Sequence, residues 1–129
     1  MAARAEDWYK QACHDLQHAR RALQGGDFEW ACFAAQQAPE KALKALYQKA
    51  GAEGRGHSVL ALVQNLPAPL AADPLLLQHG KELDKHYIPA RYPNAYPEGA
   101  PYEYYTKAEA ERAVSQSEQI LRFCEGHLP

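Results

Sequence analysis

The sequence WACFAAQQAPEKALKALY, residues 30–47, is the longest stretch of the chain that fits a single helix. At about 100° per residue, its alanines gather on one side of that helix, and larger apolar residues widen the arc to roughly half the circumference. The rest of the circumference is occupied by Gln37, Glu40, Lys41, Lys44 and Gln48. An apolar arc this wide is typical of a helix with several neighbours, and alanine allows those neighbours to approach closely. The stretch therefore predicts the central helix of an all-α domain.

The sequence before this stretch predicts a first helix. Apolar residues step by three or four positions over residues 3–23, which is the spacing of one buried helix face. Gly25 and Gly26 can end that helix by supplying a left-handed residue, and Asp27 is expected to cap the central helix. The first two helices should therefore form a tight antiparallel pair.

Start signals mark three further helices after the central one. A serine, an aspartate or a threonine at each start can accept hydrogen bonds from the first free backbone N–H groups. Pro74 follows Asp73 and suits the first helical position, and Glu109 completes a capping box with Thr106. The predicted segments are a short helix from Ser58 to before Pro67, a helix from Asp73 to before Pro89, and a last helix from Thr106 to Gly126.

Prolines mark two exceptions to regular helical structure. Pro39 removes a backbone hydrogen bond inside the central helix, which should bend the helix at a cost of about 3 kcal/mol unless other contacts offset it. In PARYPNAYPEGAP, residues 89–101, a proline recurs at every fourth position and excludes regular helix. The tyrosines of this loop need a surface to pack on, so we expect the loop to lie on the helices.

Composition narrows the possible classes of function. A chain of 129 residues fits one domain, and a formal charge of -2 does not favour general nucleic-acid binding. Three scattered cysteines suit reduced thiols in a cytoplasmic protein, and no apolar run approaches the roughly 18 residues of a membrane span. His14 and His18 are one helical turn apart but lack an evident third ligand, so we expect no metal and no cofactor.

Two segments together resemble a known family. They are FAAQQAPEKALKAL, residues 33–46, and HYIPARYPNAYPEG, residues 86–99, with GHSVLAL near His57 between them. Their order resembles the HEPN domain (higher eukaryotes and prokaryotes nucleotide-binding), in the branch with an RYP loop found in bacteria and archaea and at the C-terminus of sacsin. The resemblance implies one domain over residues 1–129, an up-and-down four-helix bundle with an additional short helix, commonly a homodimer.

The resemblance also implies a function. It implies binding of a nucleotide such as ATP or GTP, or partnership with a minimal nucleotidyltransferase in a toxin–antitoxin pair. Other HEPN branches are metal-independent ribonucleases, in which an arginine and a histidine four to six residues apart form a composite site across a dimer. Arg91 is followed by YPNAYPE, which contains no histidine. We therefore expect a non-catalytic module without catalytic residues; the alternatives are a ribonuclease toxin and a pure homodimerisation or interaction protein.

Four polar residues are candidates for contact with phosphate. Lys41 and Lys44 share a stripe of the central helix with Gln37 and can face an anion, while Arg91 can supply a bidentate clamp from the loop. The alternative interpretation is structural, because lysine and arginine are common on exposed faces. The lysines would then cover a solvated helix face, and Arg91 would tie down its own loop.

Tyr92 and several histidines complete the candidates. Tyr92 can stack on a base, although packing of the loop on the helices is the alternative use of its ring. His57 begins the short helix after a glycine-rich loop and can meet a ligand or donate to a neighbouring carbonyl. His79, Glu82 and His86 form another stripe, beside the core face of their helix, which is a weaker candidate for a functional site.

Overall fold

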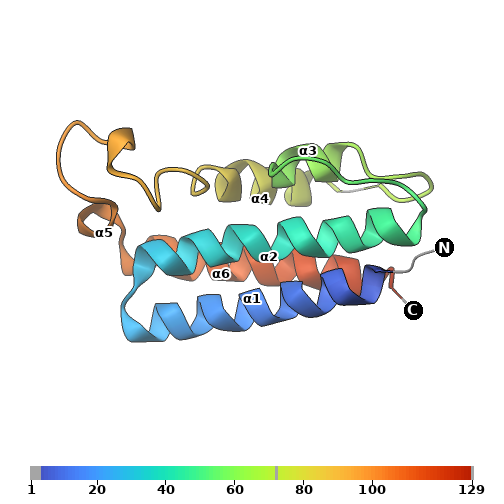
Figure 1. The fold of residues 1–129 in the computed structure, drawn as a ribbon, viewed down its shortest axis with the longest axis horizontal. Coiled ribbons are helices and arrows are strands. Elements are labelled where there is room, and N and C mark those ends of the chain that lie inside the picture. The colour runs from blue at the N-terminus through green and yellow to red at the C-terminus, as the bar shows by residue number, and fades with distance from the viewer. Residues whose placement is uncertain (1–3, 72, 129) are drawn as a thin grey trace.

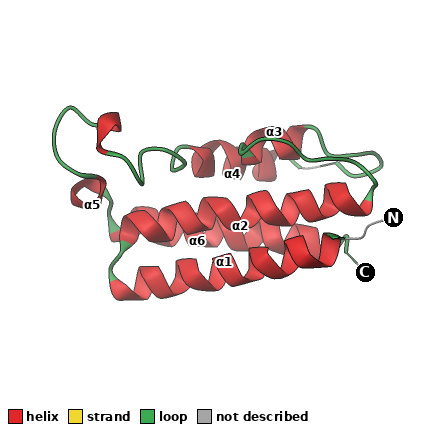
Figure 2. Ribbon diagram, viewed as in Figure 1, coloured by secondary structure: helices red, strands yellow, loops and turns green. Residues whose placement is uncertain are grey.

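The computed structural model describes residues 4–71 and 73–128, and these residues form helices joined by loops and turns, without a strand (Figure 2). The longer helices are α1 (Ala5–Gly25), α2 (Phe28–Lys49), α4 (Pro74–Asp84) and α6 (Lys107–Glu125). The short elements are α3 (Val59–Gln64), the 3-10 turn η1 (Pro93–Ala95) and α5 (Pro101–Tyr104). The all-α fold predicted from the sequence is confirmed, while α5 was not predicted.

Helix α2 occupies the centre of the molecule. Figure 1 shows α1, α2 and α6 side by side, with α3 and α4 forming a further layer over α2. Ala31, Ala35, Ala38 and Ala42 are fully buried, which confirms the predicted packing role of the alanine face. Pro39 is also fully buried, and α2 continues through it without interruption. Burial of the proline ring in the core offsets part of the cost of the missing hydrogen bond.

The helix starts confirm most of the predicted caps. The hydroxyl of Ser58 accepts a hydrogen bond of 3.0 Å from the Ala61 N–H, and Asp73 accepts one of 3.0 Å from the Leu76 N–H. Both residues have extended backbone, with ψ of 115° and 166°. The capping box of Thr106 and Glu109 closes in both directions at the start of α6.

Asp27 occupies the predicted N-cap position of α2, but its side chain does not cap the helix. Gly26 ends α1 with φ of 84°, as expected, and the chain turns at once into α2. Asp27 then has ψ of 71°, short of the extended backbone seen at the other helix starts, and its side chain accepts no hydrogen bond from α2. Only its carbonyl oxygen is used, accepting from the Ala31 N–H at 2.9 Å.

The chain between α4 and α6 differs from the expectation that it lies on the helices. Helix α4 ends at Asp84, and Figure 1 shows the chain between η1 and α5 extending past the N-terminal end of α2. The Tyr96 hydroxyl donates to the Pro89 carbonyl at 2.9 Å, the Tyr96 and Tyr104 rings stack at 4.3 Å, and the Tyr104 hydroxyl donates to the Glu98 carbonyl. Tyr96 and Tyr104 thus pack mainly on their own loop.

Two further observations concern the cysteine thiols and the apolar character of the helices. The three cysteines are free thiols, with Cys32 and Cys124 buried in the core and Cys13 half-buried. Burial raises the pKa of Cys32 to about 12, so this thiol stays protonated at neutral pH. Among the described helices, none combines the length and the apolar character that crossing a membrane requires.

Candidate functional site

Arg91 lies in the turns that follow α4, where its guanidinium packs among aromatic rings. Its Nε donates a hydrogen bond of 2.8 Å to the carbonyl oxygen of Tyr87. Its Cζ lies 4.2 Å from the centre of the Phe33 ring, 4.7 Å from that of Tyr87 and 5.0 Å from that of Tyr92. These are cation–π distances. No carboxylate of the described residues forms an ion pair with Arg91, so aromatic rings and the Tyr87 carbonyl oxygen hold its guanidinium.

His57 reaches the same aromatic group from the loop between α2 and α3. Its ring stacks on the Tyr87 ring, with centres 5.2 Å apart and planes 17° from parallel. Its Nδ1 lies 3.3 Å from Oε2 of Glu40, while 61% of the side chain stays exposed. Arg91 and His57 are therefore brought together by one tyrosine. We call Arg91, His57, Phe33, Tyr87 and Tyr92 the Arg91 cluster.

A row of polar side chains on α2 lies next to this cluster and contacts His57. The row consists of Gln36, Gln37, Glu40 and Lys44. Glu40 is only 4% exposed and accepts hydrogen bonds from Gln37 at 3.3 Å and from Lys44 at 3.2 Å, besides its contact with His57. Gln37 also donates to Gln36 at 2.8 Å, and Gln36 donates to the His57 carbonyl at 2.8 Å. A buried carboxylate that accepts hydrogen bonds from several donors fixes the positions of those donors. The row therefore holds His57 at two points, the imidazole ring through Glu40 and the backbone carbonyl through Gln36.

Asp84 holds the start of α3 in place beside this row. Its carboxylate accepts hydrogen bonds from the Ser58 hydroxyl at 2.8 Å, from the Val59 N–H at 2.8 Å and from the Leu60 N–H at 3.0 Å. A carboxylate at a helix N-terminus is favoured by the free N–H groups and by the helix dipole. Asp84 thereby fixes the backbone that follows directly after His57.

The structure connects five of the six predicted contact residues. Arg91, Tyr92 and His57 meet around Tyr87, while Gln37 and Lys44 meet His57 through Glu40. Lys41 does not join them. Its Nζ forms an ion pair of 2.5 Å with Asp15 of α1, and both side chains are largely buried. For Lys41 the geometry favours the structural interpretation.

Sequence reasoning missed three residues of this region. Glu40 was assigned to the solvated side of α2, but the loop after α2 covers it and brings His57 to it. Phe33 and Tyr87 were not among the predicted contact residues. The available signal was spacing, because Phe33, Gln37 and Glu40 recur at the interval of one helix face, and Tyr87 precedes Arg91 by about one turn.

The HEPN domain family model matches residues 5–127. The chain belongs to the HEPN family. Among curated proteins, it is 27% identical over 133 residues to the candidate toxin MJ1304 of Methanocaldococcus jannaschii, covering 96% of this chain and 88% of that protein. The family resemblance drawn from residues 33–46 and 86–99 is thus confirmed, whereas the assignment to the RYP-loop branch stays a prediction.

Solved structures similar to this HEPN chain cover more than nine-tenths of its length. The crystal structure of TT1696 from Thermus thermophilus has a TM-score of 0.95 and 48% identity, covering 97% of this chain and 98% of that one. ST0689, described as an archaeal HEPN homologue, has a TM-score of 0.80 and 48% identity, with 95% and 96% covered. A HEPN domain protein of Thermotoga maritima, TM0613, has a TM-score of 0.76 and 40% identity, with 93% and 95% covered.

Proposed function

We propose that this HEPN chain is a non-catalytic module that binds a nucleotide such as ATP or GTP, with Arg91 as the main phosphate contact. The observation that carries this proposal is the state of the guanidinium. It is half-buried, oriented by a hydrogen bond and aromatic rings, and has no acidic partner among the described residues. Arginine pairs with phosphate through two parallel hydrogen bonds, and a side chain already held in place loses less entropy on binding.

The rest of the Arg91 cluster supplies surfaces for the other parts of a nucleotide. The ring of Tyr92 is 48% exposed and can stack on a base, and the largely exposed imidazole of His57 can donate to a phosphate or a ribose. Gln37 is half-buried beside the cluster and can hydrogen-bond to the ligand. Lys44 contributes positive charge from the row of polar side chains on α2, although its ammonium group forms an ion pair with Glu40.

Isothermal calorimetry with ATP and with GTP tests this proposal. Wild-type protein should bind at least one of them, and Arg91→Gln should weaken binding by about tenfold or more, because a charge-assisted hydrogen bond contributes about 1.5–3 kcal/mol. Arg122→Gln, an exposed change at the far end of α6, is the matched control and should bind as wild type does. Absence of heat at millimolar nucleotide, or equal binding by Arg91→Gln, would contradict the proposal.

We further propose that the module works in a toxin–antitoxin type pair, with a minimal nucleotidyltransferase as protein partner. The similarity to a candidate toxin supports this context. Trp30 and Ile88 are 48% and 42% exposed, and large exposed apolar side chains of this kind suit a homodimer or partner surface. The free thiols suit the reducing cytoplasm. Light scattering of the chain alone, and with the purified partner, measures both associations; a strict monomer that binds no partner would contradict them.

A ribonuclease is the second candidate, and one contact favours it. His57 and Arg91 meet at Tyr87, and Glu40 holds Nδ1 of His57, which leaves Nε2 to exchange a proton while Arg91 binds the phosphate. Incubation with structured and single-stranded RNA in EDTA tests it. Cleavage that disappears in both His57→Gln and Arg91→Gln would establish the ribonuclease and overturn the non-catalytic proposal. No cleavage would dismiss the ribonuclease.

A further inference from the structure

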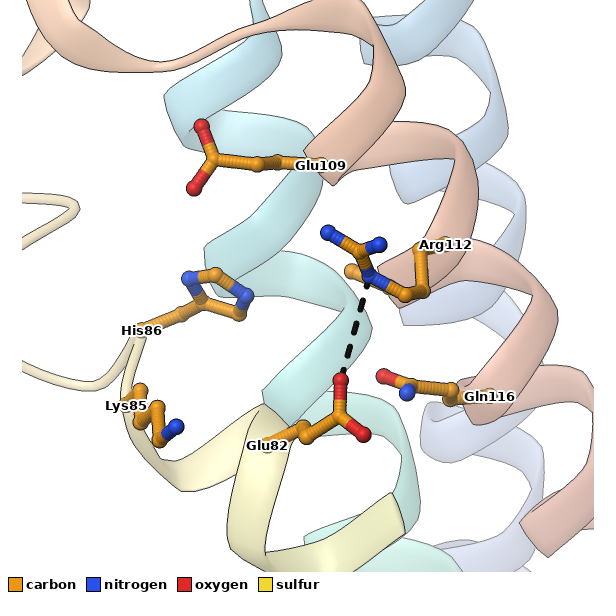
Figure 3. A pocket seen from close by; sticks show the side chains of 7 residues that line it. Glu82, Lys85, His86, Glu109, Arg112 and Gln116 are labelled. Atoms are coloured by element: carbon orange, nitrogen blue, oxygen red, sulfur yellow. Dashed lines mark ion pairs between the residues drawn. The ribbon is translucent and has the colours of Figure 1, made fainter.

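A cleft lies between the end of α4 and the first half of α6, away from the Arg91 cluster (Figure 3). It encloses about 190 Å³, which corresponds to about six water molecules at about 30 Å³ each. Pockets for larger ligands usually begin at about 300 Å³, so this cleft suits a small molecule and is too small for a nucleotide. The cleft, which we call the α4–α6 cleft, is lined by Glu82, Lys85, His86, Glu109, Arg112, Ala113 and Gln116.

The charges around the α4–α6 cleft are balanced and incompletely paired. Glu82 and Glu109 carry negative charge, and Lys85 and Arg112 carry positive charge, so the formal sum is zero. Nε of Arg112 lies 3.8 Å from Oε1 of Glu82, which is longer than a hydrogen bond. Lys85 has no ion pair with the described residues. The cleft therefore offers separated charges of both signs to a ligand.

Gln116 adds a hydrogen-bonding group to the lining of the cleft. The residue is only 6% exposed, and its side-chain amide makes no hydrogen bond with another described residue. Figure 3 shows this amide directed into the cleft, towards Arg112 and Glu82. The buried side-chain atoms without a partner among the described residues are Nδ1 of His79 and Oγ of Ser117, so the Gln116 amide reaches the solvent of the cleft and can bond to a polar ligand there.

His86 adds a neutral polar group to the same cleft. Its Nδ1 lies 3.0 Å from the Tyr105 hydroxyl, and Figure 3 shows the ring directed into the cleft, so Nε2 remains for a ligand. Burial lowers the pKa of His86, which keeps the imidazole uncharged at neutral pH. The balance of two acidic and two basic side chains is therefore not disturbed by the histidine.

We propose that the α4–α6 cleft binds a small zwitterion of the α-amino acid type. A carboxylate of the ligand would meet Arg112 and the Gln116 N–H, and its ammonium group would meet the carboxylates of Glu82 and Glu109. A ligand with one charge would pair with the charged side chains of one sign only and leave those of the other sign without a partner. This site shares no residue with the Arg91 cluster and goes beyond the proposed nucleotide binding.

Thermal unfolding with added small molecules tests the chemical class of the ligand. The probes are the free amino acids, with glycine as the smallest, and the single-charge controls are acetate and methylammonium, alone and mixed. At least one amino acid should raise the melting temperature, because a ligand that binds only the folded state stabilises it. Acetate and methylammonium should not reproduce that shift. No shift with any amino acid, or an equal shift with the mixed controls, would overturn the proposal.

Variants of the lining residues test whether the amino acid binds in this cleft. Arg112→Gln and Gln116→Leu should each weaken amino-acid binding by about tenfold or more and leave nucleotide binding unchanged. Lys107→Gln, an exposed change on the same helix outside the cleft, is the control. Side-chain NMR signals of His86 and Gln116 should shift on titration. If Gln116→Leu does not fold, the exposed Arg112→Gln still decides, and wild-type affinity in it would exclude this site.

Discussion

Gln36, fully buried in the middle of α2, donates a hydrogen bond of 3.2 Å to Oδ1 of Asp84 at the end of α4. The same amide nitrogen donates to the carbonyl oxygen of His57. One buried amide therefore joins the central helix, the loop before α3 and the end of α4. The position of His57 in the Arg91 cluster depends on this junction as much as on its own ring contacts.

Replacement of Asp84 should destabilise the junction. Asp84→Ala removes the acceptor for two N–H groups of α3 and for Gln36, so we expect the free energy of unfolding to fall by about 3 kcal/mol in urea titrations. Ser58→Ala removes a single cap and should cost about 1 kcal/mol. Asp7→Ala removes only an exposed pair and serves as control. Similar losses in Asp84→Ala and Asp7→Ala would refute the assigned role.

Gly80 should not tolerate a side chain. A Cβ at this position would lie 2.9 Å from Cα of Leu60 and 3.0 Å from its backbone nitrogen, because α3 packs directly on α4 there. Gly80→Ala should therefore lower the free energy of unfolding by about 1–3 kcal/mol. Gly25→Ala is the matched control: its nearest neighbour would be 3.9 Å away, so the variant should be neutral or slightly more stable. Equal stability of the two variants would contradict this packing.

Lys41 should act in stability and not in ligand binding. Lys41→Met and Asp15→Ala should each cost about 1 kcal/mol in chemical unfolding, and the double variant should cost less than their sum, because both lose the same ion pair. The affinity of Lys41→Met for ATP or GTP should stay within about twofold of wild type. A loss of affinity as large as that of Arg91→Gln would restore Lys41 as a ligand contact.

His86 should make the fold sensitive to acid. Burial lowers the pKa of His86 in the folded protein below its ordinary value of 6.5, so the unfolded chain takes up the proton first. The stability linked to the neutral ring is complete above pH 6.5 and is lost as the pH falls through the lower pKa of the folded state. Urea midpoints at about pH 7.5 and about pH 5 should differ less in His86→Gln than in wild type. His14→Gln, exposed on α1, should behave as wild type.

Local chemistry explains what the sequence could predict of the fold. The caps at Ser58, Asp73 and Thr106 need only a polar side chain and the next few N–H groups, so each could be read from adjacent residues. The tight turn at Gly26 sets a backbone angle at Asp27 that residue type does not reveal, and that cap failed. The stacked tyrosines of the loop could not be anticipated, because their partners lie on the same loop rather than on the helices.

In the candidate site too, some residues could be predicted from the sequence and others depend on distant segments of the chain. Arg91, Tyr92, His57, Gln37 and Lys44 were selected from the sequence, and contacts connect them. The role of Lys41 could not be predicted, because its partner Asp15 lies 26 positions away on another helix. Burial of Glu40 was hidden for a similar reason, since the loop that covers it begins after α2 ends. Helical periodicity reports the face of a residue and not which distant segment covers that face.

The loop between Tyr92 and Tyr105 is closed largely by contacts of its own tyrosines. Arg91 is fixed by Tyr87, which precedes it, and by Phe33 of α2, whereas the loop beyond it is closed by its own tyrosines. The contacts that close this loop are thus separate from those that hold the guanidinium of Arg91.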